Sequence, residues 1–464
     1  MYQHLTDHNL IRNCETRTSY DICKMLKVYV FLCISNVVLA QNLGAFQEVF
    51  AWKQVTYDIN GIQLLQDRYG DVENERMKRE TDRLVFSTVE EQNSNQGSVT
   101  TPPDTNADAN KFFIQYNNVP MGAEKVGHRL FVAFPRRRYG IPATLNYIDL
   151  NDQNGRSPAL KPYPNIYSGR SLISVYRTRA DTCGRLWMVD TGLLELPVAV
   201  NRRQLQPPAI VVFDLKTDQE IFRYTFKESD IPSASTPTGL ASITVDITNN
   251  CADAYAYVPD LTTNGIIVYS LRDNDSWRIT HNYFNFNPLS ENLRVSGEYF
   301  QWSDGIFSIA LSPAGSGCRT AYFHPLISTQ EFSISTCLLQ NRTASSDRYF
   351  FDKLTYLGER GSNSQSTMHD FYEPSRVLFF ADIGRDAISC WNTERKLEPQ
   401  NVAILAQDSE RLSYPSDLHI TDNEVWVIAN KLPRFGYSSL DTNQYNFYIY
   451  KANVRDLLSG TVCE

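Results

Sequence analysis

Polar side chains that could transfer protons recur near the ends of short apolar runs in this chain. Five of them follow such a run, namely Asp190, Asp260, His324, Asp382 and Asn430, and four precede or open one, namely Asp304, His369, Asp370 and Asp417. Carboxylates and imidazoles that converge on a cavity can move protons to and from a small molecule. An Asp after a strand is also a common turn former, since it bonds its own backbone, and for each residue alone the turn is the favoured interpretation.

The runs themselves form a repeat. Six copies of one phrase occur, such as GHRLFVAFPR from Gly127 and CGRLWMVDTG from Cys183, and the others begin at Ala252, Gly317, Ser375 and Asp422. Each copy is a polar turn, an apolar or alternating run and a polar or Gly/Pro break, which is typical of a half-buried strand. The copies start 56, 69, 65, 58 and 47 residues apart. This spacing predicts a repeat unit of about four strands.

Two further strand patterns accompany each copy. A period-two segment follows it, as in Ala209–Lys216, and another precedes it, as in Leu172–Arg179. No stretch of helical length has a 3.6-residue period, so consecutive antiparallel meanders are expected. One such sheet cannot cover both of its faces, whereas six packed radially can. The sequence therefore predicts an all-β fold, a six-bladed β-propeller of four-stranded antiparallel blades, over residues 41–464.

Composition narrows the class of partner. The net charge is −8 and the isoelectric point is near 5.5, which argues against nucleic acid or an anionic membrane as the main partner. The one basic run, Arg136 to Arg138, is interpreted as a solvated turn in preference to an anion site. We expect a monomer that binds a small molecule.

The N-terminal region resembles a leader. A Lys, an apolar run from Val28 to Leu39 and a Val-Leu-Ala before Gln41 predict a signal peptide cleaved after Ala40, with Met25 as the preferred start. Residues 1–40 are thus interpreted as leader and signal peptide, and the protein as secreted and extracellular. A second unusual stretch, residues 64–110, is rich in Glu, Asn, Ser and Thr and is predicted to be a disordered insertion.

Removal of the leader would leave six cysteines, an even number that suits an oxidising compartment. We expect the disulfides Cys183–Cys251, Cys318–Cys390 and Cys337–Cys463, the first two because their members fall in neighbouring blades. There is no CxxC and no His at a ligand spacing from these cysteines, so neither a metal nor a cofactor is expected. Asn274 and Asn341 begin glycosylation sequons in polar connections.

Long segments resemble the insect yellow and major royal jelly protein family. They include AWKQVTYDI (Ala51 to Ile59), the run from Asn117 to Leu150, VYRTRADTCGRLWMVDTG (Val175 to Gly192), Phe323 to Thr336 and SCWNTE (Ser389 to Glu394). The resemblance extends from about Phe46 to about Tyr437 and implies a secreted six-bladed propeller. It also implies one of several activities: dopachrome isomerisation in melanin formation, binding of biogenic amines, or a nutritional or signalling role. The fold alone does not choose among them.

For a dopachrome isomerase, the site needs a base, a donor for the developing phenolate and a cation for the substrate carboxylate. On the resemblance, His324 or His369 would be the base, Asp382 would orient an imidazole, and Arg177 or Arg179 would bind the carboxylate. The remaining candidates for ligand binding are Asp190, Asp260, Asp304, Asp417, Asn430 and Tyr116.

Two alternatives remain open. In the first, aromatic residues such as Tyr116, Tyr255 or Phe435 hold a flat catechol or indole while Asp or Asn holds the amine, and the protein binds its ligand without turnover. In the second, Asp304, Asp417 and Asn430 bind a divalent ion, as in a metal-dependent lactonase.

Overall fold

The computed structural model of the protein describes residues 42–69, 111–152, 155–194, 203–232, 239–314 and 317–464. Residues Leu43–Glu464 form one compact unit. The predicted signal peptide and its cleavage site lie outside the described residues.

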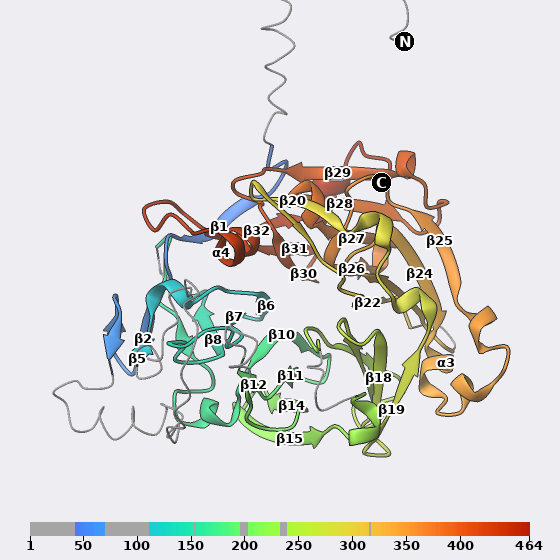
Figure 1. Cartoon of the computed structure of the whole chain (residues 1–464), viewed down its shortest axis with the longest axis horizontal. Helices are drawn as coiled ribbons and strands as arrows, with labels where there is room; N and C mark the ends of the chain where they lie inside the picture. Colours follow the sequence, from blue (N-terminus) through green and yellow to red (C-terminus); the bar gives the residue numbers. More distant parts are fainter. Residues whose placement is uncertain (1–41, 70–110, 153–154, 195–202, 233–238, 315–316) are drawn as a thin grey trace, which may run out of the picture. The chain divides into compact units, whose positions relative to one another are not determined.

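Six four-stranded antiparallel sheets surround a central axis, which confirms the predicted β-propeller (Figure 1). Blade 1 consists of β6–β9 (Gly122–Val126, Arg129–Ala133, Leu145–Asp149, Lys161–Pro162). Blade 2 consists of β10, β11, β14 and β15 (Val175–Ala180, Arg185–Asp190, Ala209–Asp214, Gln219–Thr225). Blade 3 consists of β16–β19 (Thr244–Ile247, Ala254–Asp260, Gly265–Ser270, Asp275–Thr280). Blades 4 and 5 are β22–β25 (Ile306–Leu311, Thr320–Pro325, Gln330–Ser335, Thr355–Glu359) and β26–β29 (Ser366–Tyr372, Val377–Asp382, Ala387–Asn392, Val402–Gln407).

Blade 6 joins the two ends of the propeller sequence. Its inner three strands are β30 (Pro415–Thr421), β31 (Glu424–Ala429) and β32 (Phe447–Asn453), and its outer strand is β1 (Gln47–Trp52). Gln47 pairs with Lys451, and Trp52 pairs with Phe447. The ring is therefore closed by backbone hydrogen bonds between segments that lie far apart in sequence.

The repeated phrases correspond to defined strand positions. The phrase that begins at Gly127 and its five copies form the second strand of each blade, and the period-two segments form the first and third strands. The inner strands β6, β10, β16, β22, β26 and β30 contact one another in that order and back to β6. The starts of these strands and the ends of the second strands consequently lie on one face of the ring.

The hydrophobic core lies between neighbouring blades. Trp187 and Val212 of blade 2 pack against Ala256, Val258 and Tyr269 of blade 3, and the other blade pairs make equivalent clusters. Each sheet is thus apolar on both faces, which explains why many second and third strands are nearly continuous apolar runs.

Smaller elements decorate the ring. They are the hairpins β2–β3 (Tyr57–Ile59, Ile62–Leu64), β4–β5 (Arg68–Tyr69, Lys111–Phe113), β12–β13 (Leu193–Leu194, Arg203–Gln204) and β20–β21 (Asn292–Val295, Glu298–Gln301), and the helices α3 (Thr336–Gln340), α4 (Leu432–Tyr437) and α5 (Val454–Leu458). The predicted start of the disordered insertion, residue 64, is too early. Leu64 is the last residue of β3, and β4 pairs with β5. Residues 70–110 lie outside the described residues.

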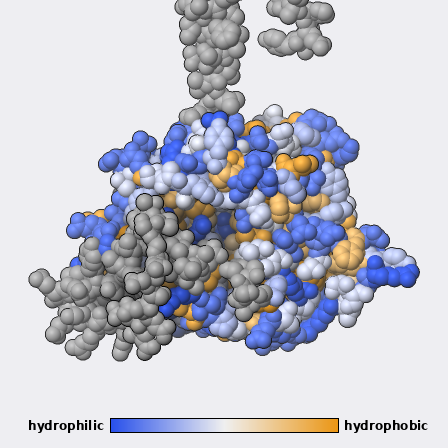
Figure 2. Space-filling model, viewed as in Figure 1, coloured by the Kyte–Doolittle hydropathy of each residue, from blue (hydrophilic) through white to orange (hydrophobic). Residues whose placement is uncertain are grey.

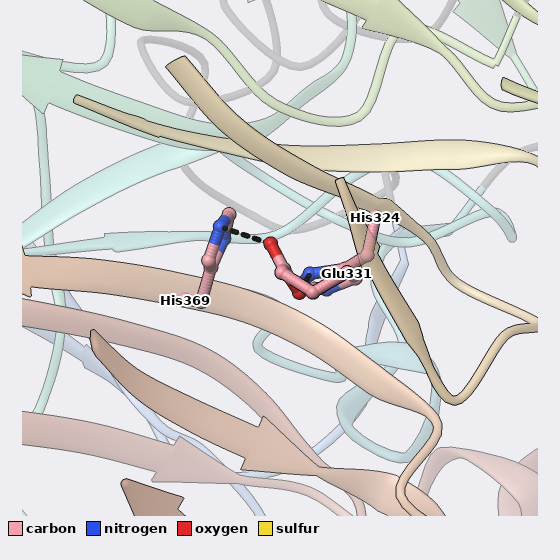
Figure 3. A group of neighbouring side chains, drawn as sticks. All are labelled: His324, Glu331 and His369. Carbon is pink, nitrogen blue, oxygen red and sulfur yellow. Dashed lines mark hydrogen bonds and ion pairs between the residues drawn. The ribbon is translucent and has the colours of Figure 1, made fainter. Parts of the chain in front are cut away.

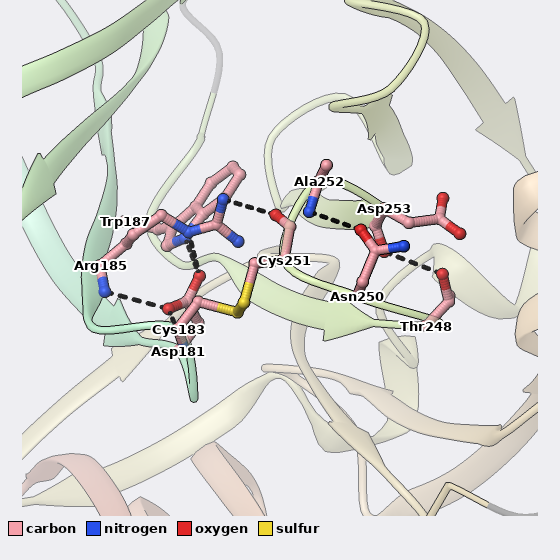
Figure 4. The surroundings of a disulfide bond; sticks show 9 residues. All are labelled: Asp181, Cys183, Arg185, Trp187, Thr248, Asn250, Cys251, Ala252 and Asp253. Carbon is pink, nitrogen blue, oxygen red and sulfur yellow. Dashed lines mark hydrogen bonds and ion pairs between the residues drawn. A yellow bond between two sulfur atoms is a disulfide. The ribbon is translucent and has the colours of Figure 1, made fainter.

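One of the three predicted disulfides is confirmed. Cys183 and Cys251 join blades 2 and 3, and Arg185, whose Nε donates to Asp181, also donates from Nη1 to the Cys251 carbonyl (2.7 Å), so the cross-link lies within a polar network (Figure 4).

The other two predicted pairings are wrong. Cys318 pairs with Cys337, and Cys390 pairs with Cys463. Cys318 precedes β23 and Cys337 follows β24, and the antiparallel register of these strands places Thr320 opposite Ser335, so the two cysteines meet within blade 4. Cys463 follows α5, whose chain end reaches β28, where Asn392 donates to the Cys463 carbonyl.

The two sequon asparagines are exposed in the structure. Asn274 lies in the turn between β18 and β19, and Asn341 follows α3. Both positions are accessible to a glycan, and glycosylation stays a prediction.

Candidate active site

A cavity of about 730 Å³ opens on the face where the inner strands begin. Its walls come from the loop after β7, the start of β10, the hairpin β20–β21, helix α4 and the segment that precedes β30. The space-filling view shows hydrophilic and hydrophobic residues intermixed on the face presented, with a hollow near its centre (Figure 2). The volume falls within the usual range for sites that bind small molecules.

Aromatic side chains form much of the cavity wall. The lining includes Tyr176, Trp302, Phe307, Tyr414, Phe435 and Tyr437. The Trp302 indole donates to the Tyr437 hydroxyl (2.6 Å), and its ring meets the Tyr414 ring edge-on with 6.0 Å between centroids. These contacts hold the rings in fixed orientations, so that the wall could stack against a flat aromatic ligand.

Charged groups of both signs share the same cavity. Asp304, Glu291, Arg137, Arg138 and Arg177 all line it. The Arg138 guanidinium lies 4.0 Å from the centroid of the Phe435 ring, which holds this side chain against the wall. An aromatic cleft with cations and carboxylates can recognise a ring and its ionic substituent together.

Asp304 has the electrostatic properties of a general base. Burial raises the pKa of its carboxyl to about 6, and the nearby Arg137 opposes part of that shift. Its backbone position is tightly defined, because a Cβ on the following Gly305 would lie 1.9 Å from the Asn264 Oδ1 atom. A carboxylate with a pKa just below neutrality can accept a proton and still be mostly ionised at physiological pH.

Arg177 is a buried cation in the lining of the cavity. It is 2% exposed, and its guanidinium donates to the carbonyls of Ala241 (2.8 Å) and Ser416, which belong to blades 3 and 6. The Asp417 carboxylate lies 3.6 Å away. Burial lowers the pKa of Arg177 and Asp417 raises it, with a net lowering. The Arg177 guanidinium therefore places a positive charge at the cavity and connects blades 2, 3 and 6 by hydrogen bonds.

Tyr414 is a hydrogen-bond donor that stays protonated. Burial raises the pKa of its phenol, and Asp304 raises it further, against the lowering effect of Arg177 and Arg137. Its hydroxyl therefore keeps its proton across the physiological pH range and can donate to an oxygen on which negative charge develops.

Of the sequence-predicted residues, the structure brings Asp304, Arg177 and Phe435 together at the cavity. The side chains of Asp190, Asp260 and Asn430 instead form turns, because their oxygens accept hydrogen bonds from nearby backbone amides. Asp190 accepts from the backbone amides of Ile173, Ser174 and Gly192, Asp260 from those of Gly239, Thr262 and Thr263, and Asn430 from Leu432. These oxygens are committed to the backbone.

Three other predicted residues also lie off the cavity lining. Asp382 is buried against Ser389 and Arg385, so it does not orient an imidazole. Asp417 accepts from Ala123 and faces His419. Tyr116 packs on Phe435 and accepts from the Leu440 amide. With Asp417 and Asn430 engaged elsewhere, the lactonase set of Asp304, Asp417 and Asn430 does not converge. Arg179 bonds Asp370 (3.2 Å) and is likewise outside the lining.

His324 and His369 lie together, but not at the cavity. Both rings are fully buried beside Glu331, and their centroids are 4.5 Å apart. Burial lowers the pKa of His324 to about 4, while the pKa of Glu331 is held low by the two imidazoles. Neither enclosed imidazole lines the cavity, so the structure does not bring either residue to the place where the predicted base role would need it.

The chain matches the model of the major royal jelly protein family over residues 173–463. It is 40% identical over 427 residues to L-dopachrome tautomerase yellow-f of Drosophila melanogaster, covering 90% of this chain and 94% of the relative. It is also 40% identical over 364 residues to protein yellow of Drosophila yakuba, covering 76% of this chain and 65% of that relative. The chain belongs to the yellow and major royal jelly protein family. The expected resemblance is confirmed.

Sequence reasoning missed several cavity residues of this yellow-family chain. The sequence favours a solvated turn for Arg137 and Arg138, whereas in the structure Arg138 lies over the Phe435 ring and Arg137 lies near Asp304. Trp302 and Tyr414 precede inner strands, and their position just before the strands of blades 4 and 6 is the one signal that could have identified them.

Within the part of the chain that the structure describes, no helix has the length and apolar character needed to cross a membrane.

Proposed function

We propose that this protein is a secreted dopachrome isomerase of melanin metabolism. The observation that carries the proposal is the cavity in which Asp304, with a pKa of about 6, lies among aromatic rings and arginines. The relative named L-dopachrome tautomerase supports the same reaction class. Three disulfides among the described residues support an oxidising, extracellular location.

The reaction moves a proton from a ring carbon of dopachrome to a quinone oxygen, with or without loss of the carboxylate. In our proposal Asp304 removes the proton from carbon, the electron pair of that C–H bond enters the ring, and Tyr414 donates a hydrogen bond to the oxygen that becomes a phenol. The proton returns to that oxygen through solvent, so no oxidant or reductant is required. Arg137 and Arg138 hold the substrate carboxylate.

The Asp304→Asn variant tests this assignment. An amide cannot accept the proton, so we expect the enzymatic loss of dopachrome absorbance, corrected for the spontaneous rate, to fall about 10²-fold or more in kcat. The control is Asp352→Asn, which alters an exposed carboxylate outside the cavity lining. Thermal unfolding of both variants checks folding. Equal rates for wild type and Asp304→Asn would contradict Asp304 as the base.

A second candidate is a binding protein for biogenic amines. The observation that favours it is the presence of two carboxylates, Asp304 and Glu291, within the aromatic cavity, since a protonated amine with a flat ring would suit this combination. Calorimetric binding of dopamine or serotonin by a chain that does not accelerate dopachrome loss would support this function over the isomerase.

A further inference from the structure

A second polar cluster lies between blades 4 and 5 and has no part in the proposed reaction. It consists of His324 on β23, Glu331 on β24 and His369 on β26 (Figure 3). All three side chains are 0% exposed, and none of them lines the cavity. Two imidazoles and a carboxylate in an apolar core are costly unless every polar atom has a partner.

The nitrogen and oxygen atoms that face one another have the spacing of metal ligands. His324 Nδ1 lies 3.0 Å from Glu331 Oε2, and His369 Nε2 lies 3.2 Å from Glu331 Oε1. One ligand atom from each residue lies within 4.8 Å of the others. A tetrahedral zinc ion with bonds of about 2.0–2.2 Å places its ligand atoms roughly 3.3–3.6 Å apart, so small side-chain shifts would bring these three ligand atoms to zinc-binding distances.

Hydrogen bonds to residues around the cluster orient His324 and Glu331. His324 Nε2 lies 3.2 and 3.0 Å from the carbonyls of Ser366 and Thr367, and carbonyls only accept, so this nitrogen carries the hydrogen. In the neutral ring, Nδ1 then presents a lone pair to the Glu331 carboxylate. Arg360, whose Nη1 donates to Glu331 Oε2 at 2.6 Å, keeps that carboxylate in place. Such second contacts commonly orient metal-binding imidazoles and carboxylates.

His369 faces the same carboxylate. Its Nδ1 lies 2.7 Å from the Ser308 hydroxyl, which can donate or accept, and its Nε2 lies 3.2 Å from Glu331 Oε1. His369 Nε2 and Glu331 Oε1 lie at an ion-pair distance, but among the described residues neither of these buried atoms makes a hydrogen bond of normal geometry. In the tautomer in which His369 Nε2 carries no hydrogen, a cation between this nitrogen and Glu331 Oε1 satisfies both atoms.

We propose that His324 Nδ1, the Glu331 carboxylate and His369 Nε2 bind one zinc ion that joins blade 4 to blade 5. Imidazole and carboxylate ligands suit a divalent transition ion better than calcium or magnesium, which prefer oxygen ligands alone. Because the site is enclosed, the ion is structural and does not meet the substrate. The inference goes beyond the proposed isomerase and departs from the expectation, drawn from cysteine spacing, that the protein binds no metal.

The test begins with the metal content of the wild-type protein, expressed by secretion, freed of any histidine tag and dialysed. We expect elemental mass spectrometry to find about one zinc ion per chain. His369→Gln should reduce that content at least tenfold. The matched control is His419→Gln, which alters another buried histidine that faces Asp417 at 3.1 Å in blade 6, and it should keep the zinc.

A second measurement does not depend on any variant. Wild-type protein treated with chelator is titrated with zinc chloride, which should raise its melting temperature, and with cobalt chloride, which should produce the visible bands of a four- or five-coordinate site. Zinc-free protein that shows neither response would overturn the proposal and indicate that a shared proton occupies the cluster. Because the site is remote from the cavity, dopachrome conversion by that zinc-free protein would leave the isomerase proposal intact.

Discussion

Asp304 illustrates how one side chain acquires a chemical property from its surroundings. Partial enclosure beside aromatic rings raises the pKa of its carboxyl, and Arg137 limits the rise, so the pKa lies near 6. The turn-forming carboxylates Asp190 and Asp260 accept several backbone hydrogen bonds, and the second oxygen of Asp260 accepts from the side chains of Thr263 and Arg278, so all four oxygens are engaged within the protein. The difference between a base and a turn former at similar strand ends is therefore set by hydrogen-bond partners.

The pH dependence of the reaction follows from this pKa. Only the ionised carboxylate can accept a proton, so kcat/KM for dopachrome should fall as the pH drops through about 6 and level off above it. The charged and titratable groups that interact with Asp304 are Arg137 and Tyr414, and Tyr414 stays protonated. Arg137→Gln should move the midpoint to higher pH, because it removes the cation that lowers the pKa. A profile with no inflection between about pH 5 and 7 would contradict the assignment.

At the scale of the element, the sequence predicts strands well and contacts between elements poorly. The repeated phrase at Gly127 and its copies identify the second strand of every blade, because burial on both faces leaves a strong apolar signal. The partner of Cys390 could not be found in the same way. It depends on where α5 places Cys463, and a short terminal helix has no periodicity that reports its docking site.

The Cys390–Cys463 disulfide should contribute measurably to stability. It closes a loop with a sequence separation of 73 residues and holds the segment after α5 to β28. Removing a disulfide of this kind costs about 2–4 kcal/mol in the free energy of unfolding. We expect Cys463→Ala and the double variant Cys390→Ala, Cys463→Ala to lose similar amounts in denaturant unfolding. A double variant as stable as the wild type would show that the cross-link does not support the fold.

At the scale of the whole molecule, neighbouring blades pack face to face, and the pairing of β1 with β32 closes the ring. The inner strands form a continuous ring, and Trp52 at the end of β1 is 1% exposed and donates to the Pro158 carbonyl (2.8 Å). The number of blades could be predicted from the sequence, because each of the six copies of the phrase forms the second strand of one blade. The position of the cavity was not, because it combines loops from several blades whose sequences share no pattern.

We expect Trp52→Ala to destabilise the entire ring. Loss of a buried Trp costs about 3–5 kcal/mol, and blades that share faces should unfold in one transition. Tyr299→Ala, at a side chain that is 73% exposed, is the control. Hydrogen exchange measured for β17 in blade 3 should accelerate together with that for β31 in blade 6. Acceleration confined to blade 6 would show that the blades unfold separately.

The pairing of β1 with β32 also imposes an order on biosynthesis. β1 leaves the ribosome early, but its partner residues, such as Lys451 opposite Gln47, are made almost last. At typical elongation rates of about 5–20 residues per second, the first strand waits on the order of tens of seconds with an unpaired edge. During that interval it presents an open template for pairing with another nascent chain, so protection by chaperones would matter more for this segment than for any blade whose four strands emerge together.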